Sequence, residues 1–400
     1  MKNIGIIFGT RPEAVKFAPL IHALNDDERF GTRLISTGQH REMLDSTLAE
    51  FRITPDIDLA IMREGQSLSE VTHRILEGLC AGRHLDGLDA VMVHGDTATT
   101  LAGALAGLHS QVPIIHVEAG LRSGSNDSPF PEEANRKLVG QIAALHLAPT
   151  PGNHANLIRE GIKESAITVT GNTIVDALAW GMQNLHSYGS PVLADLDTDP
   201  RRVILATTHR RESHGQPMHE IAGALADIAR RDDVRIVVPL HLNPKVRSVM
   251  LPALSGIANV DLVDPLPYLS FCRLLRRADV IVSDSSGAEE EGPALGKPTL
   301  VLRDVTERSE SLLTGSSRLV SRHRGQIVSE VERLLDDPDA YAEMAHAINP
   351  YGDGRATERS IAAIANYFGI GPAVMPFVPG ADVIPGEMAI PGADVFASVA

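Results

Sequence analysis

Carboxylates follow several of the short apolar runs in this sequence. Asp96 and Glu118 each come directly or almost directly after such a run. Glu132 and Glu133 follow Pro131 at the start of an expected helix. Interaction with the positive end of that helix accounts for one of the two glutamates, so the other could take part in catalysis. Glu118 could serve as a helix cap or as a reactive group, and we favour the second. Carboxyl groups placed in this way can act as general acids and bases.

Cationic side chains follow other apolar runs. His209, Arg210 and Arg211 are consecutive and form a dense donor set for a diphosphate. His241 follows the next apolar run, and Arg11 lies in the first turn of the chain after Gly-Thr. Arg11, His209 and Arg210 together would offset acidic groups placed near a bound diphosphate.

Lys16 follows Arg11 in the stretch GTRPEAVKFAPL (9–20). An arginine at this turn offers a fixed charge and a forked donor for phosphate. Both side chains could equally be surface charges, and this stretch alone does not decide between the two.

The stretch SDSSGAEEEG (283–292) combines a phosphate-binding turn with three glutamates. We expect Ser285, Ser286 and Gly287 to present hydroxyl and backbone N–H groups to a diphosphate at the start of a helix. Consecutive helical residues point about 100° apart, so the three glutamates cannot converge on one metal ion. Glu291, one turn further on, can turn into the site and accept hydrogen bonds from hydroxyl groups of a ligand. The two glutamates before it are expected to face away from the site, although it stays open whether Glu289 faces the ligand or solvent.

Several function classes fit poorly. The first turn lacks the GxGxxG spacing of a nicotinamide site, and the chain has no GxSxG elbow, Walker A lysine motif or HExxH zinc helix. Cys80 and Cys272 have no metal-ligand spacing and fit a reducing cytoplasm. A net charge of −15 without a basic block argues against a nucleic-acid partner. No apolar run is long enough to cross a membrane. We therefore expect a cytoplasmic protein without cofactor or metal.

Short apolar runs alternate with longer amphipathic stretches along almost the whole chain. The runs predicted as strands are 4–8, 33–36, 90–94, 113–117, 146–149, 167–170, 203–207, 235–239, 260–263, 280–283 and 299–302. The stretches predicted as helices are 13–25, 67–81, 98–109, 151–160, 173–186, 217–231, 244–253, 267–277, 287–295 and 324–346. This alternation is typical of the α/β class, in which parallel sheets carry helices on both faces.

The domain organisation follows from length and from one interruption. A chain of 400 residues exceeds one compact core, and the segment 187–200 is dense in Gly, Pro and Asp. We predict two Rossmann-like, doubly wound domains, 1–186 and 201–355, that face a cleft where ligands bind at the carboxyl ends of the strands. The tail, 369–400, contains PGADV twice and is expected to pack as extended chain rather than as helix or sheet.

Taken together and in this order, these motifs resemble the non-hydrolysing UDP-N-acetylglucosamine 2-epimerases. The stretches that carry the resemblance are GTRPEAVKFAPL (9–20), TGQHREML (37–44), VHGDTATT (93–100), HVEAGLRSG (116–124), PFPEEANR (129–136), GNTIVDAL (171–178), THRRES (208–213), PLHLNP (239–244), SDSSGAEEEGPALGKP (283–298), RDVTERSE (303–310) and NPYGDG (349–354). The resemblance implies a fold like that of GT-B glycosyltransferases, with a C-terminal helix over 356–368 that returns to the first domain. It also implies a homodimer that interconverts UDP-GlcNAc and UDP-ManNAc without NAD or metal.

The chemistry of such a reaction restricts the site. The hydrogen on sugar C-2 is not acidic, because no carbonyl is adjacent. If UDP leaves first, C-1 becomes oxocarbenium-like and the C-2 proton becomes removable, which gives a glycal intermediate. The enzyme must stabilise the departing diphosphate and offer acid/base groups to both faces of C-2.

The resemblance also implies roles for individual residues. The implied catalytic groups are Asp96, Glu118, Glu132, Lys16 and His209. The implied UDP-binding groups are Arg11, His209, Arg210, His241, Ser285, Ser286, Gly287 and Glu291. Gln39, His40 and Arg210 resemble parts of a site where bacterial members bind a second UDP-GlcNAc as activator.

Two positions depart from the family pattern: Ser286 stands where glycine is common, and Glu289 stands where glutamine is common. Both departures could change affinity or substrate choice. Three alternatives therefore stay open: a 2-epimerase of a modified sugar such as a 2,3-diacetamido uronic acid, a GT-B glycosyltransferase, and a hydrolysing epimerase. A non-catalytic nucleotide-sugar sensor should have lost one of the three carboxylates, and none is missing.

Overall fold

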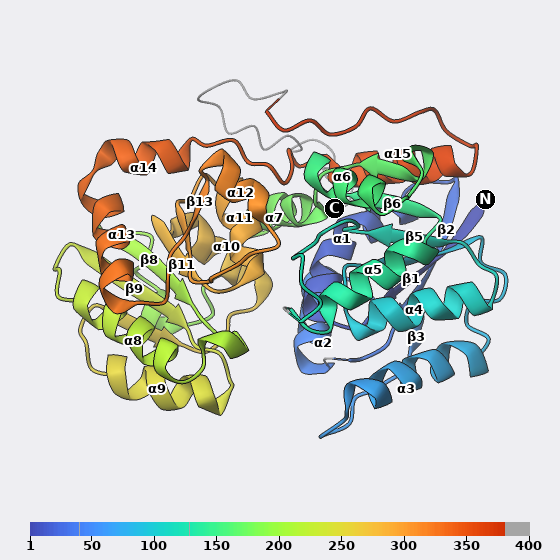
Figure 1. Ribbon diagram of the computed structural model, residues 1–400. Coiled ribbons are helices and arrows are strands. Elements are labelled where there is room, and N and C mark those ends of the chain that lie inside the picture. The colour runs from blue at the N-terminus through green and yellow to red at the C-terminus, as the bar shows by residue number, and fades with distance from the viewer. Residues whose placement is uncertain (40, 128, 381–400) are drawn as a thin grey trace. The chain divides into compact units, whose positions relative to one another are not determined.

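The computed structural model describes residues 1–39, 41–127 and 129–380 and groups them into two compact units (Figure 1). The first unit comprises Met1–Ala179 and Tyr351–Pro379, and the second comprises Trp180–Pro350 with Gly380. The sequence analysis ended the first domain at residue 186, whereas the structure divides the chain inside helix α7 (Thr173–Gln183).

The first unit is a seven-stranded, wholly parallel sheet in the order β3-β2-β1-β4-β5-β6-β7. Its strands are β1 (Lys2–Phe8), β2 (Phe30–Ser36), β3 (Ile57–Asp58), β4 (Ala90–His94), β5 (Ile114–Val117), β6 (Leu145–Ala148) and β7 (Ile167–Val169). Its helices are α1 (Arg11–Asn25), α2 (Arg41–Glu50), α3 (Leu68–Ala81), α4 (Ala98–His109), α5 (Glu132–Ile142), α6 (Pro151–Arg159), the start of α7, α15 (Ala356–Tyr367) and the 3₁₀ turn η1 (Glu164–Ala166).

The second unit is a six-stranded parallel sheet in the order β10-β9-β8-β11-β12-β13. Its strands are β8 (Arg202–Thr207), β9 (Val234–Pro239), β10 (Val260–Val263), β11 (Val280–Ser283), β12 (Thr299–Val301) and β13 (Ser317–Leu319). Its helices are α8 (Gln216–Ile228), α9 (Pro244–Leu254), α10 (Tyr268–Arg277), α11 (Ser286–Ala294), α12 (Ser309–Thr314), α13 (Arg324–Asp336) and α14 (Pro338–Ala345), with 3₁₀ turns η2 (Pro191–Leu193) and η3 (Arg211–Ser213).

Both sheets confirm the predicted α/β class. Their apolar strands are buried and form a core with the covering helices, which in the second unit include α8, α9 and α13. In each sheet the strand order reverses once, between β1 and β4 in the first unit and between β8 and β11 in the second. Ligands of doubly wound sheets bind outside the carboxyl ends of the strands at such a reversal point. The turns after these four strands are therefore the expected place for a site.

The structure differs from the predicted elements in several places, and β3, α12 and β13 lie outside all of the predicted ranges. The single helix predicted over 324–346 is two helices, α13 and α14. Pro338 cannot continue α13, and the Asp337 side chain accepts hydrogen bonds from the N–H groups of Asp339 and Ala340 to start α14. Helix α2 was not predicted, because REMLDSTLAE mixes polar and apolar residues without a strong pattern.

The segment 187–200, predicted as a linker, lies within the second unit. Three arginines hold it there. Arg235 donates to Asp195 and Asp199 and to the backbone of the segment. Arg273 pairs with Asp197, and Arg277 donates to backbone carbonyls of the segment.

The described part of the tail packs on the first unit. The Phe377 side chain is buried, its N–H donates to the carbonyl of Val169 at the end of β7, and the Arg359 guanidinium lies 5.3 Å from its ring centre. The predicted tail beyond residue 380 lies outside the described residues.

Candidate active site

The turn from β1 to α1 is closed by Glu13. Its carboxylate is buried and accepts hydrogen bonds from the N–H groups of Gly9 and Thr10 and from the hydroxyl of Thr97, which starts α4. This contact ties together the two turns that flank the reversal point of the first sheet. Burial raises the pKa of Glu13. Glu13 thus serves the architecture of the turn, and Arg11 lies half-buried at its outer edge.

Gly9 is required by this close packing. A Cβ atom at Gly9 would lie 1.9 Å from the Thr37 hydroxyl oxygen and 2.5 Å from that of Thr99. Gln39, expected from the resemblance at an activator site, is bound in the same cluster, since its side-chain oxygen accepts a hydrogen bond of 2.8 Å from Thr99. His40, the other residue of that expected site in this unit, lies outside the described residues.

Glu118 and Lys16 form a buried ion pair. The Lys16 ammonium donates to Oε2 of Glu118, and each side chain is 7% exposed. The Asn172 amide, in the turn between β7 and α7, donates to the same oxygen at 2.8 Å. The two residues of the pair lie far apart in the sequence, so the structure brings together a carboxylate and a lysine that the sequence analysis could name only separately.

Asp96 follows β4 and is held by α5. Arg136 donates to Oδ2 of Asp96 from Nε at 2.8 Å and from its terminal nitrogen at 2.6 Å, and Asn135 donates to the Asp96 backbone carbonyl. The Asp96 side chain keeps 20% of its surface exposed. A charged partner of this kind fixes the carboxylate while leaving it accessible.

Glu132 and Glu133 lie in different environments. Glu133 is fully buried and accepts hydrogen bonds from the N–H groups of Ser123 and Gly124 and from Arg136. It therefore fixes the loop before α5. Glu132 is the first residue of α5 and is half-buried, so its side chain is more exposed than that of Glu133.

Three histidines near these carboxylates are buried on neighbouring strands. Burial lowers the pKa of His94 to about 4, that of His116 to about 3 and that of His146 to about 4. All three are neutral at physiological pH. His94 packs edge-on against Phe17 of α1, with ring centres 5.4 Å apart.

In the second unit, His209 and His241 stack on each other at the ends of β8 and β9. Their ring centres lie 5.3 Å apart at an angle of 15°. Partial burial lowers the pKa of His209, and His241 and Arg210 act in the same direction, whereas Asp284 opposes them. The pKa of His241 is also lowered, mainly by burial. Two parallel neutral imidazoles at this edge form a flat polar surface.

Asp284 organises this edge, and the sequence analysis did not identify it. It is fully buried after β11 and accepts hydrogen bonds from the N–H groups of His209 and Arg210. The hydroxyls of Thr208 and Ser213 donate to it as well. A carboxylate that accepts several backbone N–H groups is a strong anchor. Its role depends on the adjacency of β8 and β11, which the sequence order alone does not reveal.

The helix α11 starts where the sequence analysis placed a phosphate-binding turn. Ser285 is its N-cap, and Ser286 and Gly287 form its first turn and are half-buried. A Cβ atom at Gly287 would lie 3.3 Å from a carboxylate oxygen of Glu291, so Glu291 folds back over this turn. Exposed N–H groups at a helix start can bind a phosphate.

Glu289 and Glu290 do not face solvent. Both are buried, at 0% and 1% exposure. Glu289 accepts hydrogen bonds from Arg303 and Thr306, and Glu290 accepts one from Arg308. The Glu289 side chain was expected to face either the nucleotide or solvent, and it lies instead in the interior of the second unit.

The same contacts correct the expected charge balance. Arg303 and Arg308 also bind Glu307, so two arginines and three glutamates form one buried cluster, which we call the acid–arginine cluster (Glu289, Glu290, Arg303, Glu307 and Arg308). Arg210 lies at its margin, 4.0 Å from Glu307. The cations that offset the acidic stretch come mainly from the loop after β12.

A first prediction concerns Glu289. Burial raises its pKa, so the ionised carboxylate is less favourable in the folded than in the unfolded chain. The free energy of unfolding therefore falls as the pH rises from the pKa of Glu289 in the unfolded chain to its higher pKa in the folded chain. Glu289→Gln should therefore have a higher urea midpoint of unfolding than the native protein at pH 8. This difference in midpoint should shrink toward pH 5. The exposed Glu343→Gln is the control, and an advantage that grows on acidification would contradict the prediction.

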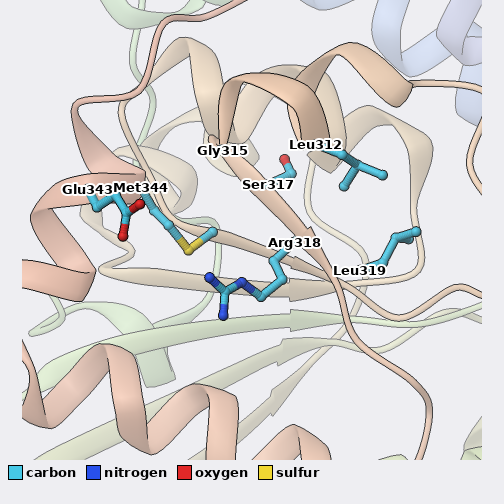
Figure 2. Close-up of a pocket in the computed structure, with 7 residues that line it drawn as sticks. All are labelled: Leu312, Gly315, Ser317, Arg318, Leu319, Glu343 and Met344. Atoms are coloured by element: carbon cyan, nitrogen blue, oxygen red, sulfur yellow. The ribbon is translucent and has the colours of Figure 1, made fainter.

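The cavity in Figure 2 is not this site. It lies at the edge of the second sheet between α12, β13 and α14, and its lining residues include Ser317, Arg318 and Glu343. None of the candidate residues lines it. Among the described residues, no group of three His, Cys, Asp or Glu side chains is placed to hold a metal ion. Likewise, no described helix is long and apolar enough to cross a membrane.

Two α/β units, each with a parallel sheet and with polar groups at the reversal point of that sheet, are the architecture of GT-B-like proteins. The family model for UDP-N-acetylglucosamine 2-epimerase matches residues 22–365. The chain is 49% identical over 368 residues to the UDP-N-acetylglucosamine 2-epimerase of Yersinia pestis, and the match covers 90% of this chain and 98% of that protein. The Escherichia coli K12 enzyme of the same name is also 49% identical, over 367 residues. The chain belongs to the UDP-N-acetylglucosamine 2-epimerase family.

Solved structures agree with this assignment. The UDP-GlcNAc 2-epimerase of Neisseria meningitidis, bound to UDP-GlcNAc, has a TM-score of 0.85 and 40% identity, and the match covers 92% of this chain and 100% of that one. The enzyme of Methanocaldococcus jannaschii, in complex with UDP-GlcNAc and UDP, has a TM-score of 0.78 and 30% identity, with 91% and 99% covered.

Proposed function

We propose that this enzyme interconverts UDP-GlcNAc and UDP-ManNAc by epimerisation at C-2. The observation that carries the proposal is the buried Lys16–Glu118 pair at the carboxyl edge of the first sheet, next to the turn that bears Asp96. A nucleotide-sugar transferase has no need of such a group at C-2 of the donor. The reaction would supply ManNAc-type sugars for surface polysaccharide.

The first unit would perform the sugar chemistry. Elimination of UDP and loss of the C-2 proton give 2-acetamidoglucal. Protonation of the opposite face and return of UDP then give the epimer. Asp96, Glu118 and Glu132 would supply the acid and base groups for the two faces. Lys16 would keep Glu118 ionised and ready to accept a proton, because a neighbouring positive charge favours the carboxylate.

The second unit would hold UDP. The hydroxyls and N–H groups of Ser285, Ser286 and Gly287 suit the diphosphate, and Glu291 suits the ribose hydroxyls. The remaining groups of the second unit in this role are His209, Arg210 and His241, and Arg11 of the first unit is proposed to bind UDP as well. Stabilising the departing diphosphate lowers the barrier to elimination, and retaining it allows the return step.

Two further features of the family are proposed for this chain as well. Gln39, His40 and Arg210 would contribute to a site for a second UDP-GlcNAc that activates the enzyme. The enzyme would act as a homodimer. Titration of the rate with UDP-GlcNAc, when the reaction is started from UDP-ManNAc, tests the first feature, and light scattering tests the second.

A second prediction concerns proton uptake on UDP binding. His209 is mostly neutral at pH 7, because its pKa is lowered. A bound diphosphate favours the imidazolium, so binding takes up a proton and UDP affinity rises as pH falls. Calorimetric titration at pH 7 in two buffers of different ionisation heat should show more proton uptake for the native protein than for His209→Gln. Equal uptake by the two proteins would contradict a contact between His209 and the diphosphate.

Product analysis tests the proposal against its alternatives. UDP-GlcNAc incubated with the enzyme should give UDP-ManNAc, seen by the anomeric proton signals in NMR, with little free UDP. Free ManNAc and stoichiometric UDP would indicate a hydrolysing epimerase. UDP release that requires an added acceptor would indicate a glycosyltransferase. Turnover of only a 2,3-diacetamido uronic acid substrate would move the proposal to the modified sugar.

A further inference from the structure

Asn172 connects the reactive carboxylate to the C-terminal part of the first unit. It lies in the turn between β7 and α7 and is 3% exposed. Its side-chain N–H donates to Oε2 of Glu118 at 2.8 Å, the same oxygen that Lys16 binds. Neither the ion pair nor the acid/base chemistry of the three carboxylates gives Asn172 a role.

Both ends of the Asn172 amide are fixed. Its side-chain oxygen accepts a hydrogen bond of 3.1 Å from the N–H of Ile174, which orients the amide so that its nitrogen points to Glu118. Its backbone N–H donates to the carbonyl of Tyr351 at 2.6 Å. Gly171, with φ of 86°, lets the chain pass close to this segment, since a Cβ there would lie 3.3 Å from the Cβ of Ala356.

Glu118 needs such support because its backbone is unfavourable. Its φ is 59°, in the left-handed region that glutamate rarely adopts. A residue in this region persists only when the surrounding structure holds it. The contacts from Lys16 and Asn172 come from two different elements, and both end on the carboxylate.

We propose that Asn172 is a positioning residue for Glu118: its side-chain amide, oriented by the N–H of Ile174 on a backbone that is anchored to Tyr351, fixes the orientation of the carboxylate and donates a hydrogen bond that cannot be lost by titration. This inference rests on the proposed epimerase function. The segment that starts at Tyr351 thereby takes part in setting the reaction geometry of the first unit.

Asn172→Asp would destabilise the ionised Glu118 carboxylate, which the Asn172 amide stabilises. It would place a second carboxylate at hydrogen-bond distance from Glu118, and like charges favour protonation of one of them. Lys16 on α1 and His94 at the end of β4 also interact with Glu118. Substitution of Asn172 leaves these groups unchanged, so a shift between variants reports on residue 172.

The test compares the pH dependence of kcat for Asn172→Asp and Asn172→Ala with that of the native protein. Asn172→Ala should lower kcat roughly 10- to 100-fold, with KM changed much less, because a misplaced reactive group affects the chemical step. Asn172→Asp should move the acidic limb of the profile upward by about one pH unit or more. Asn366→Asp, which adds the same charge on the exposed face of α15, is the control and should keep the native profile.

The outcomes separate this inference from the proposed function. Absence of epimerisation by the native protein would overturn the proposed function itself. Native-like kcat and pH profile in both Asn172 variants, while the native protein epimerises, would overturn only the role of Asn172. If Asn172→Asp does not fold, the kcat and KM of Asn172→Ala decide, and an equal loss in UDP affinity and kcat would mean a merely structural role.

Discussion

Replacing Glu118 by glutamine is expected to lower kcat for epimerisation by about 10²- to 10⁴-fold, the range over which a positioned acid or base contributes. The amide cannot accept the C-2 proton, and it leaves Lys16 buried without its carboxylate. UDP affinity should change little, because the proposed nucleotide-binding groups lie mostly in the second unit. Stopped assays of UDP-ManNAc formation and calorimetric titration with UDP measure the two quantities.

Two comparisons sharpen this prediction. Glu28→Gln, on an exposed turn of the same unit, should keep native kcat. Lys16→Met should also reduce kcat, and the double variant should lose much less than the product of the two single losses, since the pair acts as one unit. Near-native turnover of Glu118→Gln would remove Glu118 from the acid/base set, and full additivity of the two losses would mean that the pair does not act as one unit.

Replacing Arg303 by methionine is expected to lower the free energy of unfolding by about 3–5 kcal/mol at pH 7, the usual effect of removing one partner from a buried ion pair. Glu289 and Glu307 would keep their charges in the interior without this guanidinium. Urea unfolding followed by the fluorescence of Trp180, the only tryptophan, measures the loss. The loss should shrink toward pH 5, where the carboxylates can take up protons.

A matched pair and a rescue test the cause. Arg318→Met removes an exposed partner of Glu330 and should cost less than about 1 kcal/mol. Adding Glu289→Gln to Arg303→Met should recover part of the stability, because it removes one of the stranded charges. A loss as small as that of Arg318→Met, or no recovery in the double variant, would mean that the acid–arginine cluster does not hold α11 to the loop after β12.

The strands and the fold class could be predicted from the sequence because buried parallel strands appear as apolar runs. The turns that bear Asp96, Glu118 and Ser285 follow such runs directly, so their positions at strand ends were predictable as well. The strand order could not be predicted. The reversal points, which bring β1 next to β4 and β8 next to β11, could therefore not be predicted either. Asp284 was missed for this reason, since its hydrogen-bond donors follow a different strand.

The acidic stretch shows where local reasoning fails. Helical geometry rightly separated the directions of Glu289, Glu290 and Glu291, but it could not say what lies on each side of a short helix. Charged residues are rarely buried unless they are paired, and the partners here, Arg303 and Arg308, follow a different strand. The sequence analysis had used the stretch that carries these arginines, RDVTERSE (303–310), only as part of a family resemblance.

The central claim, removal and return of the C-2 proton, is tested most directly by isotope exchange. UDP-GlcNAc incubated with the enzyme in deuterated water should acquire deuterium at C-2 as UDP-ManNAc appears, and the C-2 proton signal should disappear from both sugars at equilibrium. Formation of UDP-ManNAc with full retention of the C-2 proton, or absence of any exchange at C-2 in an enzyme that binds UDP-GlcNAc, would contradict the account.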